Sequence, residues 1–411
     1  PRYHARETAI HRAKLEGARV ILGSATPSME AYYRAKEGEY VLVKLEARFE
    51  ERPLPRVSII DMREQLKKGN RLALSLELRE DLSQCLKKGE QAMLFLNRRG
   101  YAGFVSCRSC GHVMKCPHCD VSLSEHNGRK LICHYCGYET VKPDKCPVCS
   151  SPYIGGFKAG TQQIQQVVEK EFPEARVLRM DYDTTRAKGS YEKILSAFSR
   201  HEADILIGTQ MIVKGHDFPK VTLVGILAAD LSLNASDYRA GERTFQLLTQ
   251  AVGRAGRGVL PGEAVIQTYQ PDHYAITCAA AQDYESFYQE EILYRELSGY
   301  PPVAHMLAVQ IYGKEEENVK QLALRLTDVV KSNMDFLSGK QKEQSNKKIQ
   351  VLGPAPANIS KINDIYRYVF YVKHAEYDVL VEVKDRLEET LRQWQPRQMS
   401  IQFDFDPVSV L

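Results

Sequence analysis

The sequence lacks the two segments with which P-loop enzymes hold a nucleoside triphosphate. No G-x-x-x-x-G-K-S/T loop occurs in the 411 residues, and no Asp-Glu dipeptide begins a magnesium-binding D-E-x-x box. It also contains no run of about 18 apolar residues, which argues against a membrane span. The chain opens with PRYHARETAI, which has neither an initiator Met nor an apolar signal segment, so we expect a piece of a longer protein.

Low-complexity tracts and a strong excess of one charge are absent as well. The chain is 43% hydrophobic and 26% charged, which is typical of a globular protein. Its net charge of +4 neither establishes nor excludes nucleic-acid binding, because affinity for phosphate depends on local patches. The length suggests roughly two or three domains of about 150 residues each.

Cysteine, by contrast, is concentrated in one short segment. Eight of the ten cysteines lie between residues 107 and 149, in a chain too long and without the signal segment expected of a secreted disulfide scaffold. They form four C-x-x-C pairs: Cys107/Cys110, Cys116/Cys119, Cys133/Cys136 and Cys146/Cys149. Each pair puts two thiolates on one tight turn, and two pairs supply the tetrahedral sulfur shell that zinc prefers.

The gaps between the pairs predict how they combine. The gaps are 5, 13 and 9 residues, and the middle one suits a zinc ribbon that joins the second and third pairs. The outer pairs would then close a second site around it. The alternative, pairing of sequence neighbours, requires the chain to double back within 5 residues. We predict two nested structural Zn²⁺ sites, each contributing on the order of 10 kcal/mol to local folding, with iron–sulfur ligation as the alternative metal chemistry.

The pattern after this segment is regular. We predict helices at 160–172, with Thr161 as N-cap, 190–201 and 236–252, and strands at 176–181, 204–208, 221–228 and 263–269. Before the cysteines we predict a strand at 91–96, and we interpret 18–26 as a short apolar strand followed by a polar turn. The alternation predicts an α/β fold with a parallel sheet covered by helices on both faces. Ligands of such sheets lie beyond the carboxyl ends of the strands, where we expect residues 208–210 and the arginine turn at 253–257.

A second, smaller domain is predicted at the carboxyl end. A helix at 273–298 ends at Gly299, and the Pro301-Pro302 pair marks a boundary. The remaining residues predict an α+β domain of order β-α-β-β-α-β, at 305–312, 315–335, 349–352, 366–373, 375–394 and 399–405.

Three segments carry groups suited to phosphate. TQAVGRAGRG (249–258) fits Q-x-x-G-R-x-x-R, and its Arg254 and Arg257 are spaced to meet a transferring phosphoryl group. GSATPS (23–28) and GTQMIVKGHDF (208–218) each follow a predicted strand and offer hydroxyl and amide groups. Each segment alone is also compatible with an ordinary capped turn or a solvated arginine turn. The three in this order and spacing are hard to obtain by chance.

Together these segments resemble motifs III, V and VI of superfamily 2 helicases. FLNRRGYAGF (95–104) leads directly into CRSCGHVMKCPHC, and this combination resembles one family, the primosomal replication-restart helicases called PriA. LGPAPANISKINDIYRY (352–368) is similar to that family as well, and the resemblance runs from residue 1 to 411. It departs at Asp217, where many members have His, and at Gln162, where an acidic residue is common.

The resemblance implies a division into domains. Residues 1–72 would end a first RecA-like helicase lobe, 73–106 and 151–300 would form the second, 107–150 a cysteine-rich zinc-binding insertion, and 301–411 a domain like ribosomal protein S10. The P-loop and the D-E-x-H box would then lie in the part of the first lobe that these residues do not include. The chain alone is therefore expected not to hydrolyse ATP.

The resemblance also implies an activity. It is that of an ATP- and Mg²⁺-dependent 3′-to-5′ DNA helicase that recognises forked DNA and initiates primosome assembly to reload the replicative helicase. Expected partners are forked and single-stranded DNA, single-strand-binding protein, loader proteins and the replicative helicase. We expect a cytoplasmic, nucleoid-associated monomer without membrane contact. The alternatives are a non-catalytic zinc-containing nucleic-acid scaffold and a different superfamily 2 fork translocase.

Residue roles follow from the same resemblance. Catalytic roles fall to Arg254, Arg257 and Gln250, and nucleotide contacts to Gly215, Asp217, Gly253, Ser24 and Thr26. DNA contacts fall to Thr209, Gln210, Thr161, Arg98, Arg99, Tyr101 and Arg367. For Tyr101 core packing is an equal alternative, and Arg367 could instead lie on an edge strand with alternate rings buried.

Overall fold

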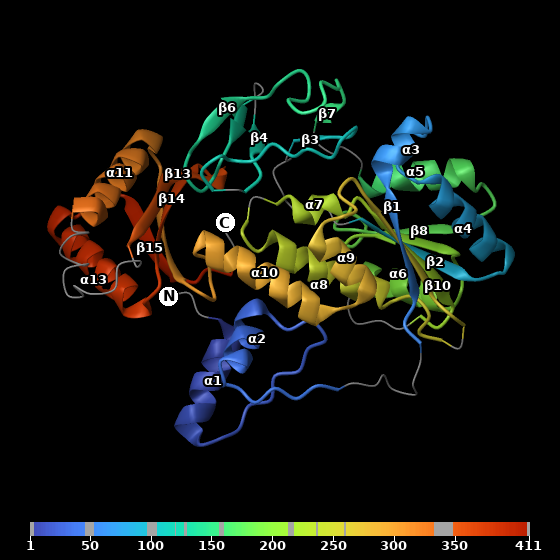
Figure 1. Ribbon diagram of the computed structural model, residues 1–411, viewed down its shortest axis with the longest axis horizontal. Coiled ribbons are helices and arrows are strands. Elements are labelled where there is room, and N and C mark those ends of the chain that lie inside the picture. Colours follow the sequence, from blue (N-terminus) through green and yellow to red (C-terminus); the bar gives the residue numbers. More distant parts are fainter. Residues whose placement is uncertain are drawn as a thin grey trace.

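A six-stranded parallel sheet forms the centre of the larger part of the molecule. The computed structural model describes residues 4–45, 53–96, 105–119, 121–126, 130–155, 160–212, 218–235, 237–258, 260–332 and 348–408. The strand order is β1-β11-β10-β2-β9-β8, and every neighbouring pair is parallel. The strands are β1 Arg56–Asp61, β2 Gln91–Leu96, β8 Val177–Met180, β9 Ile205–Gly208, β10 Val221–Leu227 and β11 Glu263–Thr268 (Figure 1).

Helices cover both faces of this sheet, as the strand pattern predicts. Successive side chains of a strand point to opposite faces. Leu94 of β2 packs in one core with helices α4 and α5, and its neighbour Phe95 packs in another core with α6, α8, α9 and α10. The helices are α4 Leu76–Lys87, α5 Thr161–Glu171, α6 Ser190–Ser199, α8 Ala240–Val252, α9 Tyr274–Ala281 and α10 Tyr284–Ser298. Burial on both sides explains why β2 reads QAMLFL without polar alternation.

Three local predictions need correction. Residues 18–24 form no strand, and Ile21 is 94% exposed, because no described strand lies beside this segment to accept its backbone hydrogen bonds. The helix predicted at 273–298 is two helices, since Gln282 adopts a left-handed φ of 55° and the Asp283 side chain caps a new helix, Tyr284–Ser298, by accepting the N–H of Ser286. The N-cap of α5 is Gly160, whose N–H is accepted by Gln163 at 3.2 Å, and Thr161 is the first helical residue.

The strand β1 bears on the expected boundary at residue 72. It pairs with β11 over its whole length, from Arg56 beside Glu263 to Asp61 beside Thr268. Residues 56–61 are therefore part of the same sheet as β2, whereas the family resemblance implied that they belong to a preceding lobe. The pairing decides this, because the polar and apolar residues of RVSIID are equally compatible with either sheet.

The helices before β1 pack less closely. Helix α1 (Ala5–Glu16) has no buried residue, whereas α2 (Met29–Lys36) packs on α10 through Tyr32, whose ring meets those of Tyr284 and Tyr288 edge-on. The shorter helices α3 (Met62–Lys67) and α7 (Asp230–Leu233) follow β1 and β10. None of the described helices combines the length and the apolar character that a membrane crossing needs.

The carboxyl-terminal domain has the predicted order of elements. Four antiparallel strands lie in the order β13-β14-β12-β15, and one face is covered by α11 and α13. The elements are β12 His305–Gly313, α11 Glu316–Ser332, β13 Gln350–Ile362, β14 Ile365–His374, α13 Tyr377–Trp394 and β15 Met399–Phe405. The opposite face packs against the cysteine-rich segment in a core that includes Tyr135 and Tyr371.

The cysteine-rich segment lies between the large sheet and the carboxyl-terminal domain, at the top of the view in Figure 1. Its strands are short: β3 Ser106–Cys107, β4 Ser124–His126, β5 Lys130–Ile132, β6 Glu139–Val141 and β7 Ile154–Gly155. They form one three-stranded sheet and one two-stranded ribbon. With so little regular structure, the segment depends on other constraints to hold its fold.

Candidate functional site

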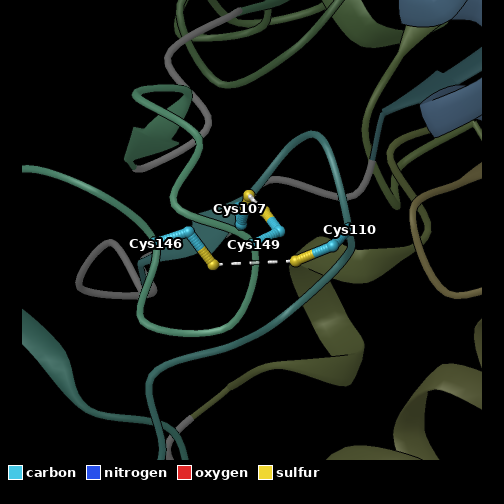
Figure 2. A group of neighbouring side chains, drawn as sticks. All are labelled: Cys107, Cys110, Cys146 and Cys149. Carbon is cyan, nitrogen blue, oxygen red and sulfur yellow. Dashed lines mark hydrogen bonds between the residues drawn. The ribbon is translucent and has the colours of Figure 1, made fainter.

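The eight cysteines come together in two clusters with the nested pairing that the loop lengths predict. The outer cluster is Cys107, Cys110, Cys146 and Cys149, and the inner cluster is Cys116, Cys119, Cys133 and Cys136. Within each, all sulfur atoms lie within 4.8 Å of one another. Figure 2 shows the four side chains of the outer cluster converging from two separate turns. All ten cysteines of the chain are free of disulfide bonds.

The sulfur spacing fits a tetrahedral zinc ion. A Zn–S bond of about 2.3 Å gives sulfur–sulfur edges of about 3.8 Å. The Sγ atoms of Cys107 and Cys149, of Cys110 and Cys146, and of Cys116 and Cys136 are each 3.6 Å apart. Four thiolates fill a zinc shell and leave no position for a water, so both sites are structural. The nearby His134 is engaged elsewhere, with its Nδ1 3.0 Å from the carbonyl oxygen of Pro356.

One backbone turn recurs at all four pairs and explains why C-x-x-C suits them. The N–H of each first cysteine donates to the carbonyl five residues later: Cys107 to His112, Cys116 to Val121, Cys133 to Tyr138 and Cys146 to Ser151, at 2.8–2.9 Å. The residue after the second cysteine adopts positive φ in three of them, at 78° for Gly111, 78° for Gly137 and 56° for Ser150. The turn therefore presents both sulfur atoms on one side.

The inner cluster already favours a thiolate. A hydrogen bond from Cys119 holds the pKa of Cys133 at about 5, and the same bond raises the pKa of the Cys119 thiol. Zinc binds thiolates, so binding of the ion releases the protons that the other cysteines of the cluster still hold.

The carboxyl edge of the sheet brings together Thr161, Thr209 and Gln210, of which Thr209 is buried at 9% exposed and the other two are half-buried. Met180 at the end of β8 is in register with Gly208 at the end of β9, so the turns that follow them lie side by side. The Thr161 hydroxyl donates to Asp181 Oδ2 at 2.5 Å, which joins the start of α5 to the turn after β8. Burial raises the pKa of Asp181, but Thr161, Thr184 and Arg179 outweigh it and lower the pKa overall.

The arginine turn lies at the amino edge instead, which corrects the expectation from the sequence. The N–H of Gly256 donates to the carbonyl of Val221, the first residue of β10, at 3.0 Å. A helix between parallel strands runs back across the sheet, so the end of α8 lies where the next strand begins. Gln250 and Arg257 are exposed, Arg254 is half-buried, and Arg257 Nε donates to the carbonyl of Gly253 at 2.8 Å.

Ser24 and Thr26 are not brought together with these arginines. They lie beside the start of α2, where the Met29 N–H donates to Glu242 near the beginning of α8. Glu242 and Arg254 are 12 residues apart, which is about 18 Å along a helix axis. The other expected nucleotide and DNA contacts, Gly215, Asp217, Arg98, Arg99 and Tyr101, lie outside the described residues.

Arg367 does not lie on an edge strand. Strand β14 is paired on both sides, with β12 and β13, and Arg367 is 9% exposed. Its guanidinium lies 5.7 Å from the ring centroid of Tyr312 and donates to the carbonyl of Ile359 at 3.5 Å. A DNA contact through this side chain would require it to leave those partners.

Sequence reasoning missed a buried tyrosine cluster that joins the cysteine-rich segment, the larger α/β part and the carboxyl-terminal domain. Tyr135, from the inner cysteine turn, stacks on Tyr371 of β14 with centroids 5.1 Å apart, and its hydroxyl accepts the N–H of Tyr238 at 3.2 Å. Tyr238 in turn stacks on Tyr300 at 4.6 Å, and Arg295 lies 4.8 Å from its ring. No periodic pattern marks these rings, because they come from four separate segments.

The fold and the cysteine clusters together define a class of protein. A parallel sheet covered on both faces, with an arginine turn after α8 and an inserted pair of four-cysteine sites, is a RecA-like helicase lobe that carries a zinc-binding insertion. Family models agree and match the PriA DNA helicase Cys-rich region at 116–140, the helicase conserved C-terminal domain at 153–259 and the primosomal protein N C-terminal domain at 296–408.

Curated relatives narrow the class to one family. The replication restart protein PriA of Bacillus subtilis is 46% identical, and the match extends over 100% of this chain and 50% of that protein. The same protein of Synechocystis sp. is 41% identical, with 100% and 49% covered. The chain belongs to the PriA family and spans about half the length of these relatives. A solved structure of S. cerevisiae Dbp5 bound to RNA and ADP BeF3 matches at a TM-score of 0.35 and 12% identity, over 71% of this chain and 59% of that one.

Proposed function

We propose that this chain supplies the second lobe, the zinc insertion and the terminal domain of an ATP-driven 3′-to-5′ DNA helicase of replication restart. Because β1 pairs with β11, the lobe is taken to comprise residues 56–106 and 151–300. The insertion then comprises 107–150 and the S10-like domain 301–411. Residues before 56 would belong with a preceding lobe, which would hold ATP and Mg²⁺ through a P-loop and a D-E-x-H box.

The position of the arginine turn carries this proposal. Helix α8 ends at Val252, and its carboxyl end presents Arg254 and Arg257 at the amino edge of the sheet, against the start of β10. Residues suited to DNA phosphates, Thr161 and Thr209, lie at the opposite edge. A lobe arranged in this way can contact a nucleotide at one edge and a DNA strand at the other, and rigid elements between the two edges can couple them.

The mechanism assigns one role to each edge. At the amino edge Arg254, Arg257 and Gln250 stabilise charge on the transferring phosphoryl group, and Gly253 contacts the nucleotide. Gly215 and Asp217, which lie outside the described residues, are assigned to the nucleotide by the family resemblance alone. Ser24 and Thr26 act between the lobes. At the carboxyl edge Thr209, Gln210 and the amino end of α5 hold strand phosphates, because a helix amino terminus favours anions. Closure of the lobes on ATP and their opening after hydrolysis then move the strand.

The zinc insertion and terminal domain would act at the fork. Arg98, Arg99 and Tyr101 lead into the insertion and combine cations with a ring, and Arg367 lies on the terminal domain. In the cytoplasm of the cell the protein would recognise forked DNA and recruit the replicative helicase with loader proteins and single-strand-binding protein. The two zinc ions keep the insertion folded and take no part in the reaction.

The decisive experiment separates the two edges in the protein at the full length of its relatives. Arg257→Ala is expected to lower the turnover number of DNA-stimulated ATP hydrolysis by about 10³-fold or more, while affinity for single-stranded DNA stays unchanged. Thr209→Ala is the matched variant at the other edge and is expected to weaken DNA binding. Loss of DNA binding by Arg257→Ala would contradict the assignment, and so would ATP hydrolysis by residues 1–411 alone.

A further inference from the structure

The turn after β8 carries an aromatic ring that is largely exposed. Tyr182 is 75% exposed, and among the tyrosines that the structure describes the next most exposed are Tyr153 at 46% and Tyr377 at 43%. A tyrosine ring contributes a large apolar area, so leaving it in water forfeits the stabilisation that its burial would bring. An exposed ring on a well-ordered turn is typical of a binding surface rather than of a core.

The backbone that holds this ring is rigid. The N–H of Asp181 donates to Thr184 Oγ1 at 2.9 Å, and the N–H of Thr184 donates back to Asp181 Oδ1 at 3.0 Å. Thr185 Oγ1 adds a bond to the carbonyl of Asp181 at 2.7 Å. Asp181 itself is 8% exposed. These bonds hold the backbone on both sides of Tyr182, whose side chain stays exposed.

The ring lies beside the groups that the proposed function assigns to the DNA strand. Asp181 receives the Thr161 hydroxyl from the start of α5, and Thr185 Oγ1 approaches Met211 Sδ at 3.9 Å. Met211 directly follows Thr209 and Gln210. The turn that carries Tyr182 therefore contacts both segments to which the proposed function assigns strand phosphates.

Two cations on the same turn can follow the phosphates of a nucleic-acid strand. Arg186 and Lys188 follow Tyr182 within six residues and are exposed, as is the acidic Asp183 directly after the ring. Proteins that bind single strands without sequence preference combine cations that follow the backbone with rings on which bases stack. Every base has a π face, so such a contact tolerates any sequence, as a translocating enzyme requires.

We propose that Tyr182 stacks on a base of single-stranded DNA held at the carboxyl edge of the sheet. The inference rests on the proposed function, since it takes the strand to lie along this edge. It adds a base contact to a site otherwise made of phosphate contacts. The ring contacts the substrate strand only and takes no part in the hydrolysis of ATP.

A fluorescence experiment on the 411-residue chain tests the stacking directly. The chain contains a single tryptophan, Trp394, so Trp394→Phe combined with Tyr182→Trp leaves one indole at the turn. Binding of an oligothymidylate longer than the ~4–16 nucleotides that such sites cover is expected to quench this indole, because stacking on a base quenches it. Binding of the oligonucleotide without any quenching would overturn the proposal.

Affinity measurements give an independent test. Tyr182→Leu is expected to weaken oligothymidylate binding about 5- to 150-fold, while Tyr182→Phe, which keeps the ring face, binds as the unmodified chain does. Tyr377→Leu on the terminal domain is the matched control and should leave affinity unchanged. Unchanged affinity in Tyr182→Leu would overturn the stacking role alone. Failure of the unmodified chain to bind the oligonucleotide would contradict the proposed function on which the stacking role rests.

Discussion

Each of the two cysteine clusters offers four thiol ligands, but the surroundings of the two clusters are very different. The inner cluster is enclosed, because its Cys133–Cys136 turn supplies His134 and Tyr135. These two side chains contact Pro356 and Tyr371 of the terminal domain. The outer cluster is open on one side, where Cys149 is exposed. The difference shows that two four-cysteine sites with the same ligand type stabilise different parts of the structure. The inner cluster holds three parts of the chain together, and the outer one closes the base of the insertion.

The outer cluster is nevertheless firmly docked on its other side. A Cβ at Gly111 would lie 2.5 Å from the carbonyl oxygen of Tyr269, which follows β11, and Arg63 Nη1 donates to the carbonyl of Cys110 at 3.5 Å. Its first turn therefore rests on the carboxyl edge of the large sheet, while its second turn, Cys146 to Cys149, faces solvent. Matching substitutions in the enclosed inner cluster and the partly docked outer cluster should therefore have different effects.

Removal of one thiolate from each cluster should have the largest effect. Cys133→Ser is expected to abolish zinc binding at the inner cluster, with a loss of local stability approaching ~10 kcal/mol, and to loosen the terminal domain. Cys149→Ser should unfold only the base of the insertion. Elemental analysis should give one zinc per chain for each variant instead of two, and proteolysis should release the terminal domain only from Cys133→Ser. Cys85→Ser, a buried cysteine outside both clusters, is the control. Equal proteolysis of the two cluster variants would contradict the comparison.

Substitution of the equivalent glycines should destabilise the outer cluster more than the inner one, the reverse of the order expected for the cysteine variants. Gly111 and Gly137 both have a φ of 78°, so alanine carries the same backbone strain at each. At Gly137 the nearest atom to an added Cβ is the Pro354 oxygen at 3.3 Å, against 2.5 Å for Tyr269 at Gly111. Gly111→Ala is therefore expected to cost about 2–4 kcal/mol and Gly137→Ala about 1–2 kcal/mol in the free energy of unfolding. Denaturant titration measures both, and a larger cost at Gly137 would show that the outer turn is not docked as described.

The hydroxyl of Tyr135 should account for part of the inner cluster's attachment. Tyr135→Phe keeps the stacked ring but leaves the N–H of Tyr238 buried without its acceptor, which is expected to cost about 1–2 kcal/mol of unfolding free energy. Tyr138→Phe, three residues along on the half-buried side of the same turn, is the matched control and should cost less. Equal melting temperatures for Tyr135→Phe and the unmodified chain would show that the bond to Tyr238 contributes nothing.

Release of zinc should be sequential. Exposure of Cys149 gives a chelator access to the outer ion, so we expect two phases whose rates differ on the order of ten-fold, with the slower phase from the enclosed inner ion. A colorimetric chelator assay follows both phases, and Cys149→Ser identifies its own phase by removing it. A single phase of two zinc ions would remove the distinction between the clusters.

Much of the fold is predictable because its signals are local. The C-x-x-C spacing sets each turn, and loop lengths select the nested pairing of Cys107 with Cys146 and of Cys116 with Cys133. The apolar runs of β2 and β10 indicate a sheet buried on both faces, and Gly299 marks the end of α10. Prediction fails at Gln282, where nothing in the sequence signals the left-handed turn, and at residues 18–24, whose apolar side chains predict a strand although no neighbouring strand is present among the described residues.

The candidate site divides in the same way. The sequence by itself determined that eight cysteines form C-x-x-C pairs suited to a metal, and it predicted roles for two arginines at fixed spacing and for a Gly-Thr-Gln turn after a strand. Only the tertiary structure decided where these residues lie, because helix α8 runs back across the sheet and places its arginines at the edge opposite Thr209. It also decided that β1 joins β11, that Arg367 is buried and that Tyr182 is not. These outcomes depend on contacts between segments far apart in the chain, and residue type and periodicity carry no information about such contacts.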